Sequence, residues 1–268
     1  MRLGPSTRAV ITAKMMNFSL SMPNTLKGYP LPPQVCPWAA VHLAQEALNG
    51  AVLMSGASMV DKISSWRYVE EFVDESEPVV RARMRAEELG VECVTPSVGS
   101  HLAVLASGIG AKAIIEAGTG TGVSGLYLLK GAPSAILATI DIEPEHQNAA
   151  KVAFAEAGIK GNQTRVISGR AIDVMSNMAD AAYDLIVLDA DRDTLEEQVR
   201  ESARLLRPGG VVVVPHALWR DRVPDPAMRD DATATFRDVL RFFKNQDSFV
   251  TALSPVGDGL LVASRLAE

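Results

Sequence analysis

The sequence predicts an α/β fold with a doubly wound, mostly parallel sheet, and three features of the chain indicate it. From residue 112 onward, short apolar segments alternate with amphipathic ones, the order that produces parallel strands with right-handed crossovers. The segments 183–188 and 211–214 are apolar at nearly every position, as in strands that helices cover on both faces. Residues 249–253 and 260–263 are joined by a short glycine-rich turn, which predicts a C-terminal antiparallel hairpin.

The remaining elements follow from the apolar periodicity and from residues typical of helix ends. Pro144 suits the first turn of a helix, and Gly158 suits its C-terminal cap. Asp193, with Glu196 three positions later, predicts a capped helix start, and the turn 207–210 ends that helix. The other expected strands span residues 112–117, 135–141 and 164–168, and the expected helices span residues 66–73, 77–89, 97–107, 123–129, 144–157 and 171–178, of which the first two are acidic and amphipathic.

Composition excludes some classes of protein. A chain of 268 residues that is 47% hydrophobic can bury a substantial core, and it holds no apolar run long enough to span a bilayer. The formal net charge of −6 argues against a general nucleic-acid surface, which needs a basic field to meet phosphates. Cys36 and Cys93 form no metal-binding spacing and no disulfide framework, a pattern that favours the cytoplasm.

The first 58 residues differ from the rest. They carry four basic residues against one acidic residue, and prolines interrupt their apolar stretches. A targeting peptide is one interpretation, but no cleavage signature is evident. We expect residues 1–58 to be a disordered extension, or an upstream stretch if Met59 is the true start, and residues 59–268 to form the folded domain.

A glycine-rich turn between the first expected strand and the following helix indicates a ligand site. Gly118, Gly120 and Gly122 let the backbone turn sharply and let a ligand approach without a Cβ atom in the way. In such sheets the ligand lies beyond the carboxyl ends of the strands, where the strand order reverses. Residues 120–125 also match the G-x-G-x-x-G pattern, so a dinucleotide is the rival ligand.

Two carboxylates favour S-adenosylmethionine over a dinucleotide. Glu116 lies two residues before the first glycine, where a carboxylate can receive the cationic amino group of methionine. Asp141 ends the next strand and can accept hydrogen bonds from both ribose hydroxyls, although dinucleotide sites use such a residue too. The plainer alternatives are that Asp141 only caps the loop before Pro144 and that Glu116 only forms a salt bridge.

A second pair of carboxylates, Asp189 and Asp191, follows the strand 183–188. Two carboxylates that point into one crevice suit a metal ion, a substrate hydroxyl or the cofactor. The alternative is a solvated loop before the next helix.

The order and spacing of six motifs resemble those of a known family. The motifs are EAGTGTGVSG, TIDIEPEH, SGRA, LIVLDAD, LLRPGGVVVV and VGDGLLVA. From about residue 66 to the C-terminus the chain resembles the cation-dependent O-methyltransferases, which include catechol and caffeoyl-CoA O-methyltransferases, and it looks closest to their actinobacterial branch. The resemblance implies a seven-stranded sheet, S-adenosylmethionine as cofactor, and a homodimer with residues 66–107 at or near the interface.

The resemblance also implies roles for individual residues. Asp189 would face the substrate. The implied cofactor contacts are Val94, Glu116, Gly118, Thr119, Gly120, Ser124, Asp141, Ile142, Ala171 and Asp191.

This chain departs from the family at the expected metal site. The family usually holds a divalent ion with the first aspartate of the D-A-D segment and an Asp-Asn pair after the next strand. Asp189 is present, but Pro215 and His216 occupy the positions of the pair, so we expect no Mg²⁺ site; a softer ion such as Zn²⁺ is the alternative. Arg192 replaces the family's candidate lysine base and stays protonated.

These departures leave His216 as the candidate catalytic base, because imidazole titrates near neutrality. Asp189 is the second candidate, and a purely packing role is the alternative for His216. Three functions fit the sequence: a small-molecule O-methyltransferase acting on a phenolic or catechol-like hydroxyl, a tRNA-modifying enzyme acting on hydroxylated wobble uridines, and a cofactor-binding protein whose catalysis has decayed.

Overall fold

The computed structural model describes residues 58–267. By their contacts, Ile63–Glu268 form one compact unit, which contains the sheet and the helices packed on it. The predicted N-terminal extension, residues 1–58, lies outside the described residues apart from Ser58.

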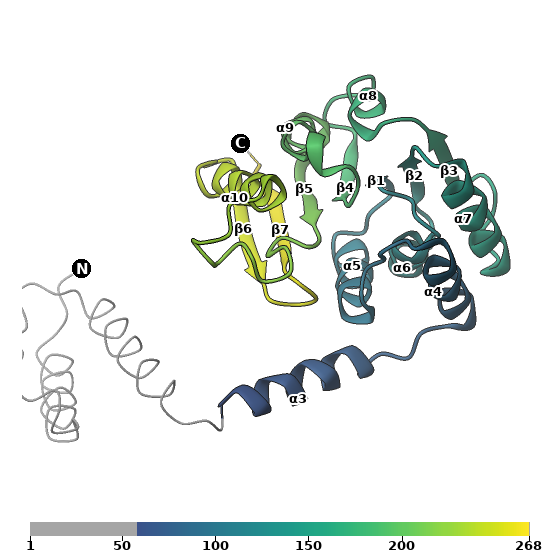
Figure 1. Ribbon diagram of the computed structural model, residues 1–268. Coiled ribbons are helices and arrows are strands. Elements are labelled where there is room, and N and C mark those ends of the chain that lie inside the picture. Colours follow the sequence, from purple (N-terminus) through teal and green to yellow (C-terminus); the bar gives the residue numbers. More distant parts are fainter. Residues whose placement is uncertain (1–57, 268) are drawn as a thin grey trace, which may run out of the picture. The chain divides into compact units, whose positions relative to one another are not determined.

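A seven-stranded sheet in the order β3-β2-β1-β4-β5-β7-β6 forms the centre of this unit (Figure 1). The pairs from β3 to β5 are parallel, whereas β7 lies antiparallel between β5 and β6. The predicted parallel sheet with a terminal antiparallel hairpin is therefore confirmed. The strands are β1 (Ala113–Ala117), β2 (Ile136–Asp141), β3 (Thr164–Ser168), β4 (Tyr183–Leu188), β5 (Leu206–Val214), β6 (Phe249–Ser254) and β7 (Leu260–Arg265).

Helices cover both faces of the sheet (Figure 1). The helices α4 to α7 pack on one face, and α8 to α10 pack on the other. In the part of the chain that the structure describes, no helix is long and apolar enough to cross a membrane. The helices are α3 (Ser58–Glu71), α4 (Glu77–Leu89), α5 (Pro96–Gly108), α6 (Val123–Gly131), α7 (Pro144–Glu156), α8 (Ala171–Met175), α9 (Leu195–Leu205) and α10 (Asp231–Lys244).

Strand β4 shows why the segment 183–188 is apolar at nearly every position instead of alternating apolar and polar residues. Leu185 and Val187 pack in the core on one face of the sheet, and Ile186 and Leu188 pack in the core on the other face. All four side chains are buried, and each contributes about 1.5–3 kcal/mol relative to exposure. A polar residue at any of these positions would face a core, so continuous hydrophobicity is required.

Two local predictions were wrong. Asp193 does not cap a helix: a 3₁₀ turn, Arg192–Thr194, precedes α9, and the side chain of Asp191 accepts from the backbone N–H of Asp193 at 3.2 Å. Strand β5 starts at Leu206 and includes the turn residues that were expected to separate it from α9. The predicted helix 66–73 is present as the end of α3, but its Trp66 and Tyr68 side chains are exposed.

Candidate active site

The glycine-rich turn leaves β1 at Ala117 and approaches the end of β4 closely. Gly118, Gly120 and Gly122 have φ values of 94°, 48° and 91°, in the left-handed region that favours glycine. A Cβ atom on Gly118 would lie 2.0 Å from the carbonyl oxygen of Asp189, so only glycine fits there. The turn therefore depends on glycine both for its conformation and for this contact.

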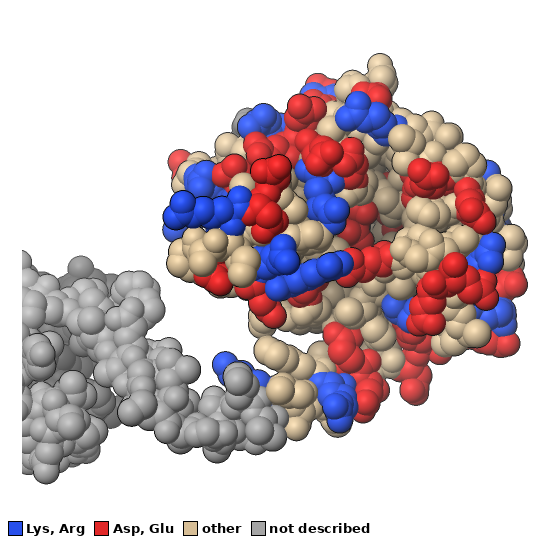
Figure 2. Space-filling view, in the orientation of Figure 1, with Lys and Arg blue, Asp and Glu red and all other residues tan. Residues whose placement is uncertain are grey.

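A cavity of about 430 Å³ lies beyond the carboxyl ends of the parallel strands, beside this turn. Its volume is in the range of small-molecule sites. Figure 2, in the orientation of Figure 1, shows a hollow in the surface with acidic side chains beside it. The predicted site residues that line the cavity are Val94, Gly118, Thr119, Gly120, Ser124, Asp141, Ile142, Ala171, Asp189 and Asp191.

Glu116 lies behind the cavity wall. Its side chain is fully buried; Oε2 accepts a hydrogen bond from Thr139 Oγ1 at 2.6 Å, and Thr139 in turn contacts Thr119 Oγ1 at 2.7 Å. Oε1 has no hydrogen-bond partner among the described residues. Burial raises the pKa of Glu116 to about 7, against the opposing effects of the Thr139 and Ser124 hydroxyls. A buried carboxylate oxygen without a partner fits an ammonium group, the role expected for Glu116.

Asp141 ends β2 at the opposite side of the turn. Its Oδ2 accepts from the backbone N–H of Gly120 at 2.9 Å, and its Oδ1 accepts from that of Glu143 at 2.9 Å. Asp141 therefore also holds the loop before Pro144, the alternative role that the sequence allows. Each carboxylate oxygen keeps a further lone pair, so Asp141 can still accept hydrogen bonds from ribose hydroxyls.

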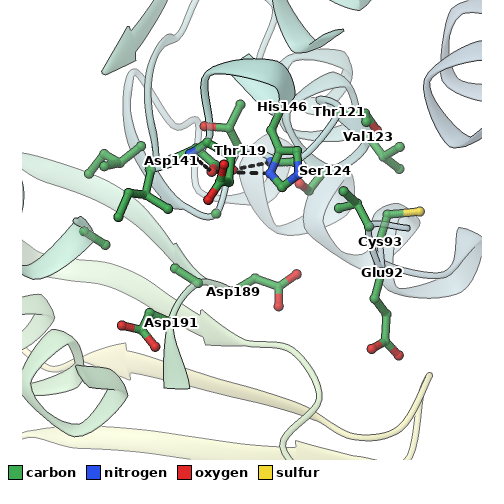
Figure 3. Close-up of a pocket in the computed structure, with 18 of the residues that line it drawn as sticks. Glu92, Cys93, Thr119, Thr121, Val123, Ser124, Asp141, His146, Asp189 and Asp191 are labelled. Carbon is green, nitrogen blue, oxygen red and sulfur yellow. Dashed lines mark hydrogen bonds and ion pairs between the residues drawn. The ribbon is translucent and has the colours of Figure 1, made fainter. Parts of the chain in front are cut away.

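His146, which the sequence did not single out, also lines the cavity. Its Nδ1 lies 3.4 Å from Asp141 Oδ1 (Figure 3). Asp141 and His146 stand on one side of the cavity, and Asp189 and Asp191 stand on the other (Figure 3). His146 follows Pro144 in the first turn of α7, where it resembles an ordinary helix residue, so nothing in the sequence marked it.

Asp189 and Asp191 differ in their surroundings although one residue separates them. Burial raises the pKa of Asp189, whereas Asp191 is exposed and holds the 3₁₀ turn. The guanidinium of Arg192 lies 4.5 Å from the ring centre of Trp219, a cation–π contact. Arg192 is therefore held against an aromatic ring rather than against a carboxylate of the cavity.

His216 does not line the cavity, but it reaches Asp189 from the loop after β5. Its Nδ1 lies 2.6 Å from Asp258 Oδ1, and its Nε2 lies 3.7 Å from Asp189 Oδ1. Burial lowers the pKa of His216, but the hydrogen bond to Asp258 and the charge of Asp189 outweigh it and raise the pKa to about 9. This pKa lies above the range near neutrality that the sequence predicts for His216.

Sequence reasoning missed Asp258. In the sequence it is one residue of the glycine-rich turn between β6 and β7, and its partner His216 lies 42 residues earlier in the chain. The two meet because β7 lies against β5, which places the hairpin turn beside the loop that follows β5.

The donors around Asp189 do not fit Mg²⁺. Pro215 is buried and offers no side-chain ligand, and Nδ1 of His216 contacts Asp258, so one carboxylate and one imidazole nitrogen remain, a poor donor set for Mg²⁺. Within residues 58–267, no three His, Cys, Asp or Glu side chains are arranged to hold a metal ion.

The fold and the cavity define an α/β methyltransferase that binds S-adenosylmethionine. A profile of the O-methyltransferase family matches residues 73–266, and the chain belongs to this family. A Mycobacterium tuberculosis relative with the name "Probable O-methyltransferase" is 46% identical over 203 residues, 75% of this chain and 91% of the relative. The chain is thus an S-adenosylmethionine-dependent O-methyltransferase.

Solved structures agree with this assignment. A protein of Corynebacterium glutamicum is 33% identical, with a TM-score of 0.70 over 75% of this chain and 95% of that one. The O-methyltransferase TomG of Streptomyces achromogenes, which takes part in tomaymycin synthesis and was solved with S-adenosylmethionine, is 26% identical. Its TM-score is 0.67 over 76% of this chain and 96% of that one.

Proposed function

We propose that this enzyme transfers the methyl group of S-adenosylmethionine to a phenolic or catechol-like hydroxyl of a small molecule, without a bound Mg²⁺. The observation that carries the proposal is the pairing of Asp189, at the cavity wall, with His216, whose Nε2 lies 3.7 Å behind it. A hydrogen-bond acceptor thus lies at the cavity wall, and a titratable imidazole lies directly behind it.

The residues of the chain divide the work between binding and proton transfer. Glu116 and Asp141 would hold the amino group and the ribose of S-adenosylmethionine, and the glycine-rich turn would shape the cavity around it. S-adenosylmethionine supplies the methyl group: the acceptor oxygen bonds to the methyl carbon, the carbon–sulfur bond breaks, and its electron pair stays on sulfur. Asp189 would accept the hydrogen bond of the acceptor hydroxyl and orient it, and the proton would pass through Asp189 to Nε2 of the neutral form of His216.

Charge favours a small acceptor over tRNA, the second candidate. Basic and acidic side chains are interspersed on the face that Figure 2 shows, and the net charge is −6. Binding of a polyanion would require a clustered basic surface. The third candidate, a binding protein without turnover, is tested by the same experiment as the other two.

The test is methyl transfer from radiolabelled S-adenosylmethionine to a panel of catechols, simple phenols and unmodified or hydroxylated tRNA. Label in a catechol or phenol, lost in Asp189→Asn, supports the proposal. Label in tRNA alone would replace it with the second candidate. Tight cofactor binding with no transfer to any acceptor would support decayed catalysis instead.

We also propose a homodimer that uses α3 and the helices after it. Trp66, Tyr68 and Phe72 are exposed near the end of α3, and Glu70 fixes this end to the start of α5 by accepting from Ser97 N at 3.0 Å. Light scattering should give twice the chain mass, and charged substitutions at Trp66 and Phe72 should give the monomer mass. A wild-type protein that is monomeric at micromolar concentration would contradict the proposal.

A further inference from the structure

The hairpin turn between β6 and β7 is packed backbone to backbone against the loop after β5. The carbonyl oxygens of Gly259 and Asp258 accept from the N–H groups of Ala217 and Leu218, each at 2.9 Å. Gly259 has φ 105°, and a Cβ atom there would lie 2.4 Å from the backbone nitrogen of Leu218. The two segments therefore hold each other in one arrangement.

The side chain of Asp258 uses this arrangement to fix the imidazole of His216. Oδ1 contacts His216 Nδ1 at 2.6 Å, and Oδ2 accepts from the backbone N–H of Arg220 at 3.2 Å. Because Nδ1–H donates to a carboxylate, the ring is held in one orientation, and Nε2 is the nitrogen that faces Asp189. The backbone of His216 has φ 58°, which is unfavourable for a residue with a Cβ atom. The contacts on both sides of the loop maintain this conformation.

We propose that Asp258 is the positioning residue for the methyl transfer, holding His216 so that its Nε2 receives the proton of the acceptor hydroxyl. This inference rests on the proposed function, in which His216 is the base. Asp258 would act only through His216 and would touch neither the cofactor nor the acceptor.

The charged groups around the His216 ring show which carboxylate affects its proton affinity most directly. Three carboxylates face His216 from different elements: Asp258 from the hairpin turn, Asp189 from the end of β4, and Glu92 from the segment before α5. Glu92 is exposed and forms an ion pair with Arg220 at 2.7 Å, so its effect on the ring is screened. Asp258 is the carboxylate bonded directly to the ring.

Asp258→Asn tests the proposal, because asparagine keeps the size of the side chain and removes its charge. The His216 ring can be followed by NMR, and its signal is the one that is absent from His216→Ala. We expect the titration of this signal to show a proton affinity about tenfold or more weaker in Asp258→Asn than in the wild type. The limb on which kcat rises with pH should move to lower pH, with a lower plateau and an unchanged KM for S-adenosylmethionine. Asp221→Asn removes one charge from an exposed residue of the same loop and should change neither measurement.

The possible failures are distinguishable. An unchanged His216 titration in Asp258→Asn would overturn the positioning role whatever the activity. A changed titration with an unmoved kcat profile would also overturn it, because His216 would then not be the proton acceptor. If no acceptor is methylated by any variant, the proposed function fails, whereas the titration alone still measures the effect of Asp258 on the ring.

Discussion

Replacing Asp141 with alanine should weaken binding of adenosylhomocysteine about 10- to 150-fold. The variant loses the hydrogen bonds that the ribose hydroxyls donate to the Asp141 carboxylate. Hydrogen bonds to a charged group contribute about 1.5–3 kcal/mol, which corresponds to this loss of affinity. The variant also loses the bonds from the N–H groups of Gly120 and Glu143, so the turn that shapes the cavity is loosened as well.

Calorimetric titration with adenosylhomocysteine is the assay, and two further variants separate the contributions. Asp141→Asn keeps one oxygen that can accept from Gly120 N–H but loses the charge and the acceptor for Glu143 N–H, so a smaller loss of affinity is expected than for Asp141→Ala. Asp247→Ala removes an exposed carboxylate far along the chain and should bind like the wild type. An Asp141→Ala variant with wild-type affinity would show that Asp141 only holds its loop and that the ribose is bound elsewhere.

Glu116, Gly118 and the N-terminal segment each give a further testable outcome. The pKa of Glu116 is raised from 4.5 to about 7, so the free energy of unfolding should fall as pH rises through this window, and Glu116→Gln should abolish that fall in chemical denaturation. Gly90→Ala should cost about 1–2 kcal/mol for its left-handed backbone, since no atom lies within 4 Å of the added Cβ. Gly118→Ala should cost at least about 1 kcal/mol more in the same assay because its Cβ overlaps Asp189, and equal losses would refute the close approach. Deletion of residues 1–58 should leave the melting temperature and cofactor binding unchanged in calorimetry; a variant that does not fold would show that this segment belongs to the core.

The sequence predicted the sheet well because its strands carry a strong local signal. Leu185 to Leu188 are apolar since each faces a core, and the glycines 118, 120 and 122 mark the turn that their backbone angles require. Glu116 and Asp141 could be placed because each lies at the carboxyl end of a strand, and parallel strands end at the same edge of the sheet.

The sequence could not predict what depends on contacts between distant segments. Asp258 meets His216 only because β7 pairs antiparallel with β5, and no local pattern reports that pairing. The pKa of His216 depends on the same contacts, so the ordinary value for imidazole was the wrong guide. The cap before α9 was misplaced by two residues, from Asp191 to Asp193, since both are aspartates in one short turn.

The most direct test of the central claim is methyl transfer after exhaustive EDTA treatment, measured across pH. We predict that activity survives, that kcat/KM rises as His216 loses its proton near pH 9, and that His216→Ala flattens this rise and lowers turnover. Restoration by Zn²⁺ or Mn²⁺ alone, after loss in EDTA, would make His216 a ligand and leave the base to be found elsewhere. Activity abolished by EDTA and restored by Mg²⁺ would contradict the account.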